Sequence, residues 1–137
     1  MTTADNLASL KAAYAAWNER KGNSLEVWRE LMHPDFRLTS WGEGAPGLEF
    51  AAPRSSREEA LNYLSAILDD WTMIHYTPKH FVSEGDWIAM FGSCAYTHKR
   101  TGKSAECKVA GLWRFENGKA VEFTDMFDSA VAVAAAS

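Results

Sequence analysis

The sequence is poor in cysteine and lacks any long apolar run. Its two cysteines, Cys94 and Cys107, are too few for a disulfide framework, so we expect free thiols in the core. No cysteine or histidine pair has the spacing of a metal site. No apolar stretch approaches the ~20 residues of a membrane-spanning helix, and the first residues, MTTADNL, lack the features of a signal peptide. These absences predict a cytoplasmic protein with no metal and no membrane contact.

The chain also has no excess of basic residues. It carries 14 Lys and Arg against 18 Asp and Glu, which gives a net charge of −4. Binding to the phosphates of nucleic acid requires an electropositive face. The one basic cluster, Lys99, Arg100, Lys103 and Lys108, is typical of a solvated hairpin tip. We therefore expect no nucleic-acid partner.

Aromatic residues, by contrast, are abundant. Six Trp, seven Phe and four Tyr occur in 137 residues, a length that suits one domain with a substantial core. A surplus of large rings commonly lines an apolar cavity or an interface. We predict a single domain over 1–137, with its core at about 5–128 and a frayed tail of small residues at 129–137.

Hydrophobic periodicity predicts three helices in the first half of the chain. Apolar residues recur at helical spacing over about 4–20 and again over 25–33, where Pro34 stops the second helix. A capping box at 55–59 opens the third helix, which reaches about Trp71. Between the second and third helices, the Gly- and Pro-rich segment 41–56 has the length and composition of a functional lid.

The remaining segments are predicted to form strands separated by tight turns. They are 36–40, 74–83, 86–99, 103–116 and 119–128. Asn117-Gly118, between the last two strands, is the pair that most readily forms a type I′ hairpin turn. This order predicts an α+β fold: a cone-shaped, strongly curved antiparallel sheet with three N-terminal helices packed on its concave face.

The last predicted strand carries the first candidate for chemistry. Asp125 shares its strand face with Phe123 and Phe127, while the residues between them face the other way. A carboxylate among aromatic rings is costly to bury in its ionised form, and desolvation raises its pKa toward that of a useful base. The other interpretation is a structural aspartate that pairs with the backbone or an arginine.

Three segments together carry a resemblance to a known family. They are Ala13-Tyr14-Ala15-Ala16-Trp17-Asn18, Leu31-Met32-His33-Pro34-Asp35-Phe36, and 113–119 running into 123–128. Their order resembles the nuclear transport factor 2-like superfamily, in particular its SnoaL-like and ketosteroid-isomerase-like branch, over roughly residues 5–128. The resemblance implies the cone fold. It is a weak indication of any particular reaction, because this fold serves many functions.

The resemblance also implies roles for individual residues. Tyr14 falls where steroid isomerases carry a tyrosine donor, but Ser40 replaces their carboxylate base and Gly111 their second donor. Asp125 occupies the place of a water-activating aspartate of limonene-epoxide-hydrolase-like members. The Arg and Asp partners expected there are replaced within 93–96 by Ser, Cys, Ala and Tyr.

A set of mostly aromatic residues is predicted to line a pocket around these two groups. Its members are Trp17, Met32, Ser40, Trp41, Tyr96, His98, Trp113 and Phe127. Trp41 opens the Gly-rich loop and suits a gate over the pocket mouth. His98 is included because it shares strand parity with Tyr96 and Cys94. Ordinary core packing is the alternative for Tyr14, Met32 and Trp113, and an edge or surface position is the alternative for His98.

These residues favour a small enzyme that needs no cofactor. Asp125 would transfer a proton on a small apolar or aromatic carbonyl compound, and Tyr14 would stabilise the developing oxyanion, giving isomerisation, dehydration or cyclisation. Two alternatives remain: a non-catalytic module that binds an apolar small molecule, and a protein-interaction domain. Trp87, Ala89 and Phe91 alternate on one strand face, so we expect a homodimer that forms through the outer face of the sheet.

Overall fold

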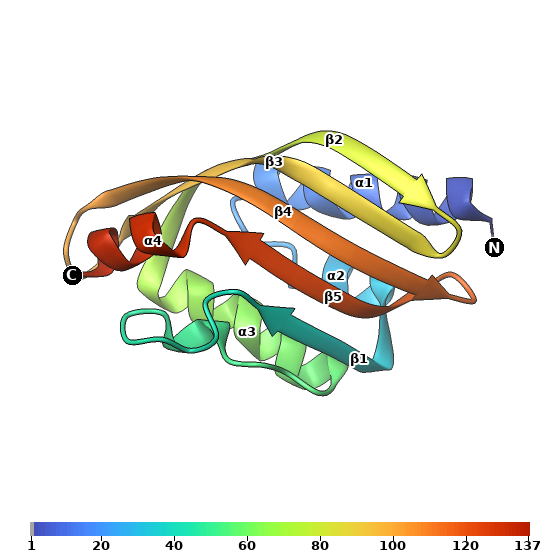
Figure 1. Cartoon of the computed structure of the whole chain (residues 1–137), viewed down its shortest axis with the longest axis horizontal. Helices are drawn as coiled ribbons and strands as arrows, with labels where there is room; N and C mark the ends of the chain where they lie inside the picture. Colours follow the sequence, from blue (N-terminus) through green and yellow to red (C-terminus); the bar gives the residue numbers. More distant parts are fainter. Residues whose placement is uncertain (1) are drawn as a thin grey trace.

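The computed structural model describes residues 2–137, which form a curved sheet with helices packed against it (Figure 1). The elements follow in the order α1 (Thr3–Glu19), α2 (Leu25–Leu31), β1 (Met32–Ser40), the 3₁₀ turn η1 (Glu49–Ala51), α3 (Arg57–Asp70), β2 (Trp71–Glu84), β3 (Trp87–His98), β4 (Ser104–Glu116), β5 (Lys119–Phe127) and α4 (Ser129–Ala136). The α+β class expected from the sequence is confirmed. None of the helices over residues 2–137 is long and apolar enough to cross a membrane.

The sheet has the strand order β1-β5-β4-β3-β2. β2 to β5 form an antiparallel meander as predicted. The edge strand β1 pairs with β5 in parallel, which the prediction of a wholly antiparallel sheet did not include. The physical reason lies in the connection: β1 is followed by the loop and α3, which carry the chain across to the far edge before the meander begins. This pairing places Ser40 directly beside Asp125.

The first helices cover one face of the sheet. In Figure 1, α1 lies behind β2 and β3, and α3 lies behind β1. A capping box between Thr2 and Asp5 starts α1. The buried face of α1 then presents Leu10, Tyr14 and Trp17 at the spacing of successive helical turns. These side chains join strand residues in one continuous core.

The C-terminal segment is helical, so the prediction of a frayed tail was wrong. Asp128 caps α4 by accepting a hydrogen bond from the amide of Val131 at 3.2 Å, and Ala132, Ala135 and Ala136 are buried. Alanine has the highest helix propensity, and its small side chain lets a helix approach the sheet closely. The guanidinium of Arg100 donates to the carbonyl of Ala136 and ties the end of α4 to the β3–β4 turn.

Candidate active site

Two adjoining cavities lie between the helices and the sheet, and they share the lining residues Ile67, Tyr76, Tyr96 and Asp125. The aromatic chamber encloses about 440 Å³, and its other walls include Tyr14, Trp17, Trp28, Met32, Tyr63, Trp113 and Phe123. The C-terminal chamber encloses about 520 Å³, and its other walls include Phe50, Trp71, Cys94, Cys107, Phe127 and Ala132. Both volumes include space that is open to solvent. All four tyrosines of the chain line the aromatic chamber.

Asp125 stands at the junction of the two chambers. It is half-buried on β5, with Ser40 of β1 on one side and Gly111 of β4 on the other. Its backbone carbonyl accepts a hydrogen bond from the Trp41 amide at 3.0 Å, which fixes the strand at this residue. Burial raises the pKa of the Asp125 carboxyl from 3.8 to about 6, against the opposing effect of a hydrogen bond from Tyr63. Around neutral pH the group is therefore a carboxylate that accepts a proton readily.

Tyr63 is a site residue that sequence reasoning missed. It lies on α3, is 1% exposed, and its hydroxyl donates to Oδ2 of Asp125 at 2.7 Å. The Ser40 side chain lowers the pKa of Tyr63, opposing the effect of burial, and Ser40 pairs with Asp125 across β1 and β5. Burial raises the pKa of Tyr63 well above 10, and Tyr63 therefore remains a neutral donor that orients the carboxylate. Its position one helical turn before Ile67 was the available signal, since both residues lie on one face of α3.

Tyr14 lies in the aromatic chamber with an uncommitted proton. Its hydroxyl accepts a hydrogen bond from Nε1 of Trp113 at 3.0 Å, and it donates to none of the side chains or carbonyls of residues 2–137. Its ring stacks on Tyr76 with centroids 5.7 Å apart. Burial raises the pKa of Tyr14 above its usual range, and the charge of Asp125 raises it further. Tyr14 is thus a neutral hydroxyl that can donate to a ligand oxygen.

Gly111 stands where steroid isomerases carry their second donor. A residue with a side chain would fit there only if the neighbouring side chains moved. A Cβ atom on Gly111 would come within 2.5 Å of the Phe123 ring and 3.1 Å of the Tyr14 hydroxyl. The Phe123 ring also stacks on Trp113, with centroids 4.0 Å apart. Aromatic packing therefore fills the space in which a donor side chain would lie.

Some of the predicted pocket residues line a chamber and others do not. Trp17, Met32 and Trp113 line the aromatic chamber, Phe127 lines the C-terminal chamber, and Tyr96 lines both. Ser40 is buried beside Asp125 and lines neither chamber.

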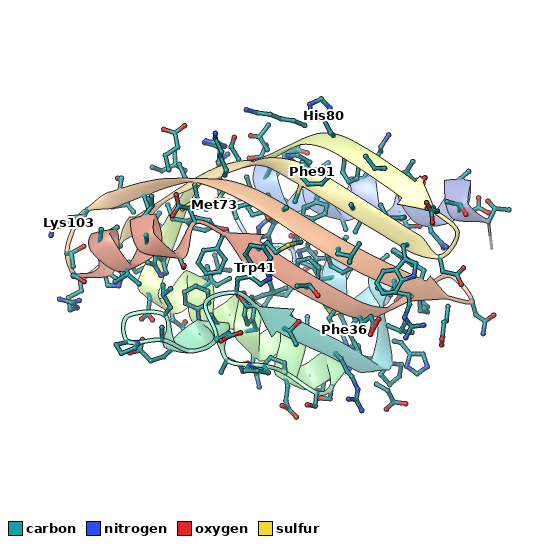
Figure 2. The ribbon with its side chains drawn as sticks, in the orientation of Figure 1. Phe36, Trp41, Met73, His80, Phe91 and Lys103 are labelled. Atoms are coloured by element: carbon teal, nitrogen blue, oxygen red, sulfur yellow. The ribbon has the colours of Figure 1, made fainter. Side chains whose placement is uncertain are left out.

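Trp41 and His98 line neither chamber. Trp41 is 64% exposed beside the ends of β1 and β5 (Figure 2), because strand alternation turns Ser40 inward and Trp41 outward. His98 is buried against Trp71, with ring centroids 4.7 Å apart, and its Nδ1 accepts a hydrogen bond from the amide of Arg100. It therefore supports the β3–β4 turn. Phe50, not Trp41, is the residue by which the 41–56 loop reaches the cavity.

Cys94 and Cys107 face each other across β3 and β4. Both are buried free thiols in the wall of the C-terminal chamber, in agreement with the sequence prediction. Their mutual hydrogen bond, together with burial, raises the pKa of Cys94, so this thiol stays protonated. Within residues 2–137, no three His, Cys, Asp or Glu side chains lie close enough together to hold a metal ion.

The curved sheet with helices on one face, and a half-buried carboxylate where its two cavities meet, define the class of small cone-shaped proteins with the nuclear transport factor 2-like fold. A family model described as a SnoaL-like domain matches residues 10–123, and the chain belongs to this family. Among curated proteins, none matches the chain.

Solved structures with the same fold cover nearly the whole chain. A protein of unknown function from Burkholderia pseudomallei, described as NTF2-like, has 26% identity and a TM-score of 0.81, covering 97% of this chain and 98% of its own. TerC, co-crystallised with polyporic acid, has 24% identity and a TM-score of 0.76, with coverage of 96% and 98%. IdmH, a putative polyketide cyclase from Streptomyces antibioticus, has 24% identity and a TM-score of 0.71, with coverage of 94% and 96%.

Proposed function

We propose that this protein is an enzyme that needs no cofactor and moves a proton on a small apolar or aromatic carbonyl compound. The observation that carries the proposal is the Asp125 carboxylate, which is desolvated, has a pKa of about 6, and borders both chambers. A base is most effective when its pKa lies near the working pH. The similarity to IdmH and TerC supports an enzyme-like use of this fold.

In the proposed reaction, the ligand lies in the cavity with its carbonyl oxygen toward Tyr14 and an adjacent C–H bond toward Asp125. Asp125 takes the proton from carbon, and the electron pair of that bond moves onto the carbonyl oxygen to form an enolate. The Tyr14 hydroxyl donates a hydrogen bond to the enolate oxygen. The Asp125 carboxyl then returns the proton to a second carbon for isomerisation, or to a departing hydroxyl group for dehydration. In cyclisation, the enolate carbon attacks a second carbonyl group and Asp125 protonates the resulting alkoxide.

Tyr63 serves this reaction by fixing the carboxylate. Its hydrogen bond to Oδ2 at 2.7 Å leaves Oδ1 free for the substrate proton. Ser40 lies on the neighbouring strand, directly beside Asp125. Ser40 is neutral and adds no second charge beside Asp125. Among the described residues, Asp125 is the single carboxylate that lines the two chambers.

The experiment that tests the proposal measures proton removal from a simple aryl ketone, so the natural substrate need not be known. 2-Acetylnaphthalene is incubated with the protein in D₂O, and incorporation of deuterium into its methyl group is followed by proton NMR. We expect the wild type to accelerate exchange and Asp125→Asn to lose roughly 10²–10⁴-fold of the acceleration, the usual contribution of a positioned base.

The matched control for this experiment is Asp35→Asn, because the Asp35 side chain is 94% exposed on β1. It should exchange the ketone at the wild-type rate. Equal acceleration of deuterium exchange by wild type and Asp125→Asn would show that Asp125 is not the base.

A second function, non-catalytic binding of an apolar small molecule, is favoured by one observation: Ser40 and Gly111 supply neither a base nor a donor side chain. TerC was co-crystallised with polyporic acid, and the rival proposal is that this protein holds a small molecule in its cavity without turnover. Tight binding of 2-acetylnaphthalene without any exchange would favour it.

The homodimer expected from the sequence remains a proposal. Trp87 and Phe91 of β3 are 41% and 47% exposed on the outer face of the sheet, and Figure 2 labels Phe91 there. Analytical ultracentrifugation of wild type and Phe91→Lys checks it: the wild type should sediment as a dimer and the variant as a monomer. A monomeric wild type would contradict it.

A further inference from the structure

The two thiols of the chain lie side by side in the wall of the C-terminal chamber. Cys94 of β3 and Cys107 of β4 are free and are direct partners across the two strands, and both line the chamber. Tyr96 and Val109, their strand neighbours on the same face, line it as well. This face of the sheet is therefore turned toward the cavity, and a small molecule in the cavity meets both thiols together.

The pairing of the two strands sets the distance between the two cysteines. The amide of His98 donates to the Lys103 carbonyl at 2.8 Å, and hydrogen-bonded pairs recur at every second residue of an antiparallel ladder. Cys94 and Cys107 lie an even number of residues from that pair, so their Cα atoms are about 5.5 Å apart. A disulfide spans Cα separations of about 4.4 to 6.8 Å. The backbone thus already has the separation that a disulfide needs.

The side chains of this pair are less well placed for a disulfide than the backbone. Directly opposite Cβ atoms in a sheet lie about 4.5 to 5.5 Å apart, whereas a disulfide holds them at about 3.8 Å. The sheet must twist to close the bond, and a strained disulfide is reduced more easily than a relaxed one. The pair therefore suits an oxidation that is later reversed.

Burial of the two thiols limits the oxidant to a small molecule. Cys94 and Cys107 are 5% and 6% exposed, and the chamber that they line includes space open to solvent. A charged peptide disulfide is too large and too polar for this apolar wall, but a neutral hydroperoxide fits. The neighbouring Cys94 thiol lowers the pKa of Cys107, against the effect of burial. Cys107 is therefore the thiol that ionises first, and the thiolate is the reactive form.

Cys107 also contacts the start of α4. Its Sγ donates a hydrogen bond to the carbonyl of Asp128 at 3.7 Å, and the same carbonyl accepts a backbone hydrogen bond of α4 from the amide of Ala132 at 3.2 Å. Ala132 lines the same chamber. A sulfur in a disulfide has no proton to donate, so oxidation removes a contact between β4 and the start of α4.

We propose that Cys94 and Cys107 are a reversible oxidation site for a small hydroperoxide, and that their disulfide loosens the start of α4 in the wall of the C-terminal chamber. The Cys107 thiolate attacks one peroxide oxygen: an S–O bond forms, the O–O bond breaks, and the leaving oxygen takes the proton that Cys107 gave up. The Cys94 sulfur then attacks the Cys107 sulfur: the S–S bond forms, the S–O bond breaks, and water leaves with the Cys94 proton. The thiols lose two electrons and the peroxide gains them. Asp125 takes no part, so this site does not depend on the proposed function.

The first test oxidises the wild type with hydrogen peroxide. Free thiols are counted by alkylation in denaturant, and the crosslinked peptide is identified by mass spectrometry without reductant. We expect both thiols to disappear together within one chain, to return with dithiothreitol, and to stay free in oxidised glutathione. Thiols that stay free in peroxide, a crosslink between two chains, irreversible oxidation, or equal oxidation by glutathione would each overturn the proposal.

Two serine variants separate the roles of the two thiols. Cys94→Ser keeps a hydroxyl beside Cys107 but removes the second sulfur, so peroxide should stop at a sulfenic acid that dimedone traps. Cys107→Ser should react at least about 10-fold more slowly, because a pKa one unit higher leaves one tenth of the thiolate. Equal trapping in the two variants would contradict the assignment of Cys107 as the attacking thiol.

Hydrogen exchange of the wild type, followed by NMR, tests the effect on α4 without any substitution. The amide of Ala132 should exchange several-fold faster in the oxidised protein than in the reduced protein, because the start of α4 has lost a contact. The control is the amide of Phe115 in β4, which donates to the Asp86 carbonyl at 2.9 Å and should be unchanged. Equal protection of Ala132 in both states would overturn the link to α4.

Discussion

The two chambers that meet at Asp125 differ in what their walls can do. The aromatic chamber carries hydroxyl and indole groups on side chains from α1, α2, α3 and β4, and neighbouring ring centroids there lie 4.0 to 6.2 Å apart. The C-terminal chamber shares Tyr76, Tyr96 and Asp125 with the aromatic chamber, and it adds Phe50 of the 41–56 loop, Ala132 of α4, two thiols and further apolar side chains. In the proposed function, the aromatic chamber orients a polar atom of the ligand and the C-terminal chamber provides room for the rest of it. Asp125 lies at the boundary between the two.

The largest effect should be on the free energy of unfolding, and it should come from the charge of Asp125 between the two chambers. The pKa of Asp125 in the folded protein, about 6, lies above the 3.8 of an exposed aspartate. Its contribution to stability is therefore complete below pH ~4 and lost as the pH rises through 6. Asp125→Asn does not ionise, so at pH 8 its free energy of unfolding should exceed that of the wild type by up to roughly 3 kcal/mol.

Urea unfolding at pH 8 and pH 4 checks this prediction, with Asp35→Asn as the control. The difference between wild type and Asp125→Asn should fall below about 1 kcal/mol at pH 4, where the Asp125 side chain is neutral in the folded protein. A variant that is less stable than wild type at pH 8 would show that the carboxylate is structural and not strained.

An effect of intermediate size, on ligand affinity, should show that the two chambers bind different parts of a ligand. Ala132→Phe places a ring in the wall of the C-terminal chamber, while Ala134→Phe places the same ring on the exposed face of α4. We expect Ala132→Phe to weaken binding of a ligand longer than one chamber about 10-fold, since loss of a buried ring contact is on the order of 1–2 kcal/mol.

2-Phenylnaphthalene and 2-acetylnaphthalene are suitable long and short ligands for isothermal titration calorimetry. The short ligand should bind Ala132→Phe as it binds wild type, because the aromatic chamber is unchanged. Equal losses for both ligands would mean that the chambers act as one undivided pocket.

The smallest effect should be a shift in pH dependence. Tyr63 lowers the pKa of Asp125 by its hydrogen bond, so Tyr63→Phe should raise that pKa above about 6. The pH at which ketone exchange reaches half its maximum should rise with it. Tyr96→Phe is the control, because Tyr96 lines both chambers but the hydroxyl that hydrogen-bonds Asp125 is that of Tyr63. An unchanged midpoint in Tyr63→Phe would show that the hydroxyl does not control the carboxylate.

Most of the fold could be predicted because its signals are local. Asn117 and Gly118 both adopt positive φ, at 49° and 79°, as a type I′ turn requires. Strand alternation placed Asp125 on the same face as Phe123, and the structure shows both in the chamber lining. α4 was missed because alanine and valine repeat without periodicity, so that no apolar stripe marks a buried face.

The site was less predictable because its members converge from distant parts of the chain. Tyr63 and Asp125 are 62 residues apart, and the hydroxyl reaches the carboxylate because α3 packs on β1, the strand next to β5. Trp41 was placed at the pocket mouth by its loop context, whereas strand parity turned it to solvent.

The docking of α4 has a practical consequence for anyone who prepares this protein. The carbonyl of Ser137 accepts a hydrogen bond from Lys103 at 2.9 Å, and Ala132 is part of the cavity wall. An affinity tag fused directly after Ser137 would therefore pull on a wall of the candidate site. The start of α1 lies far from α4 in Figure 1, so a tag on the N-terminal side of α1 is the safer choice for binding assays.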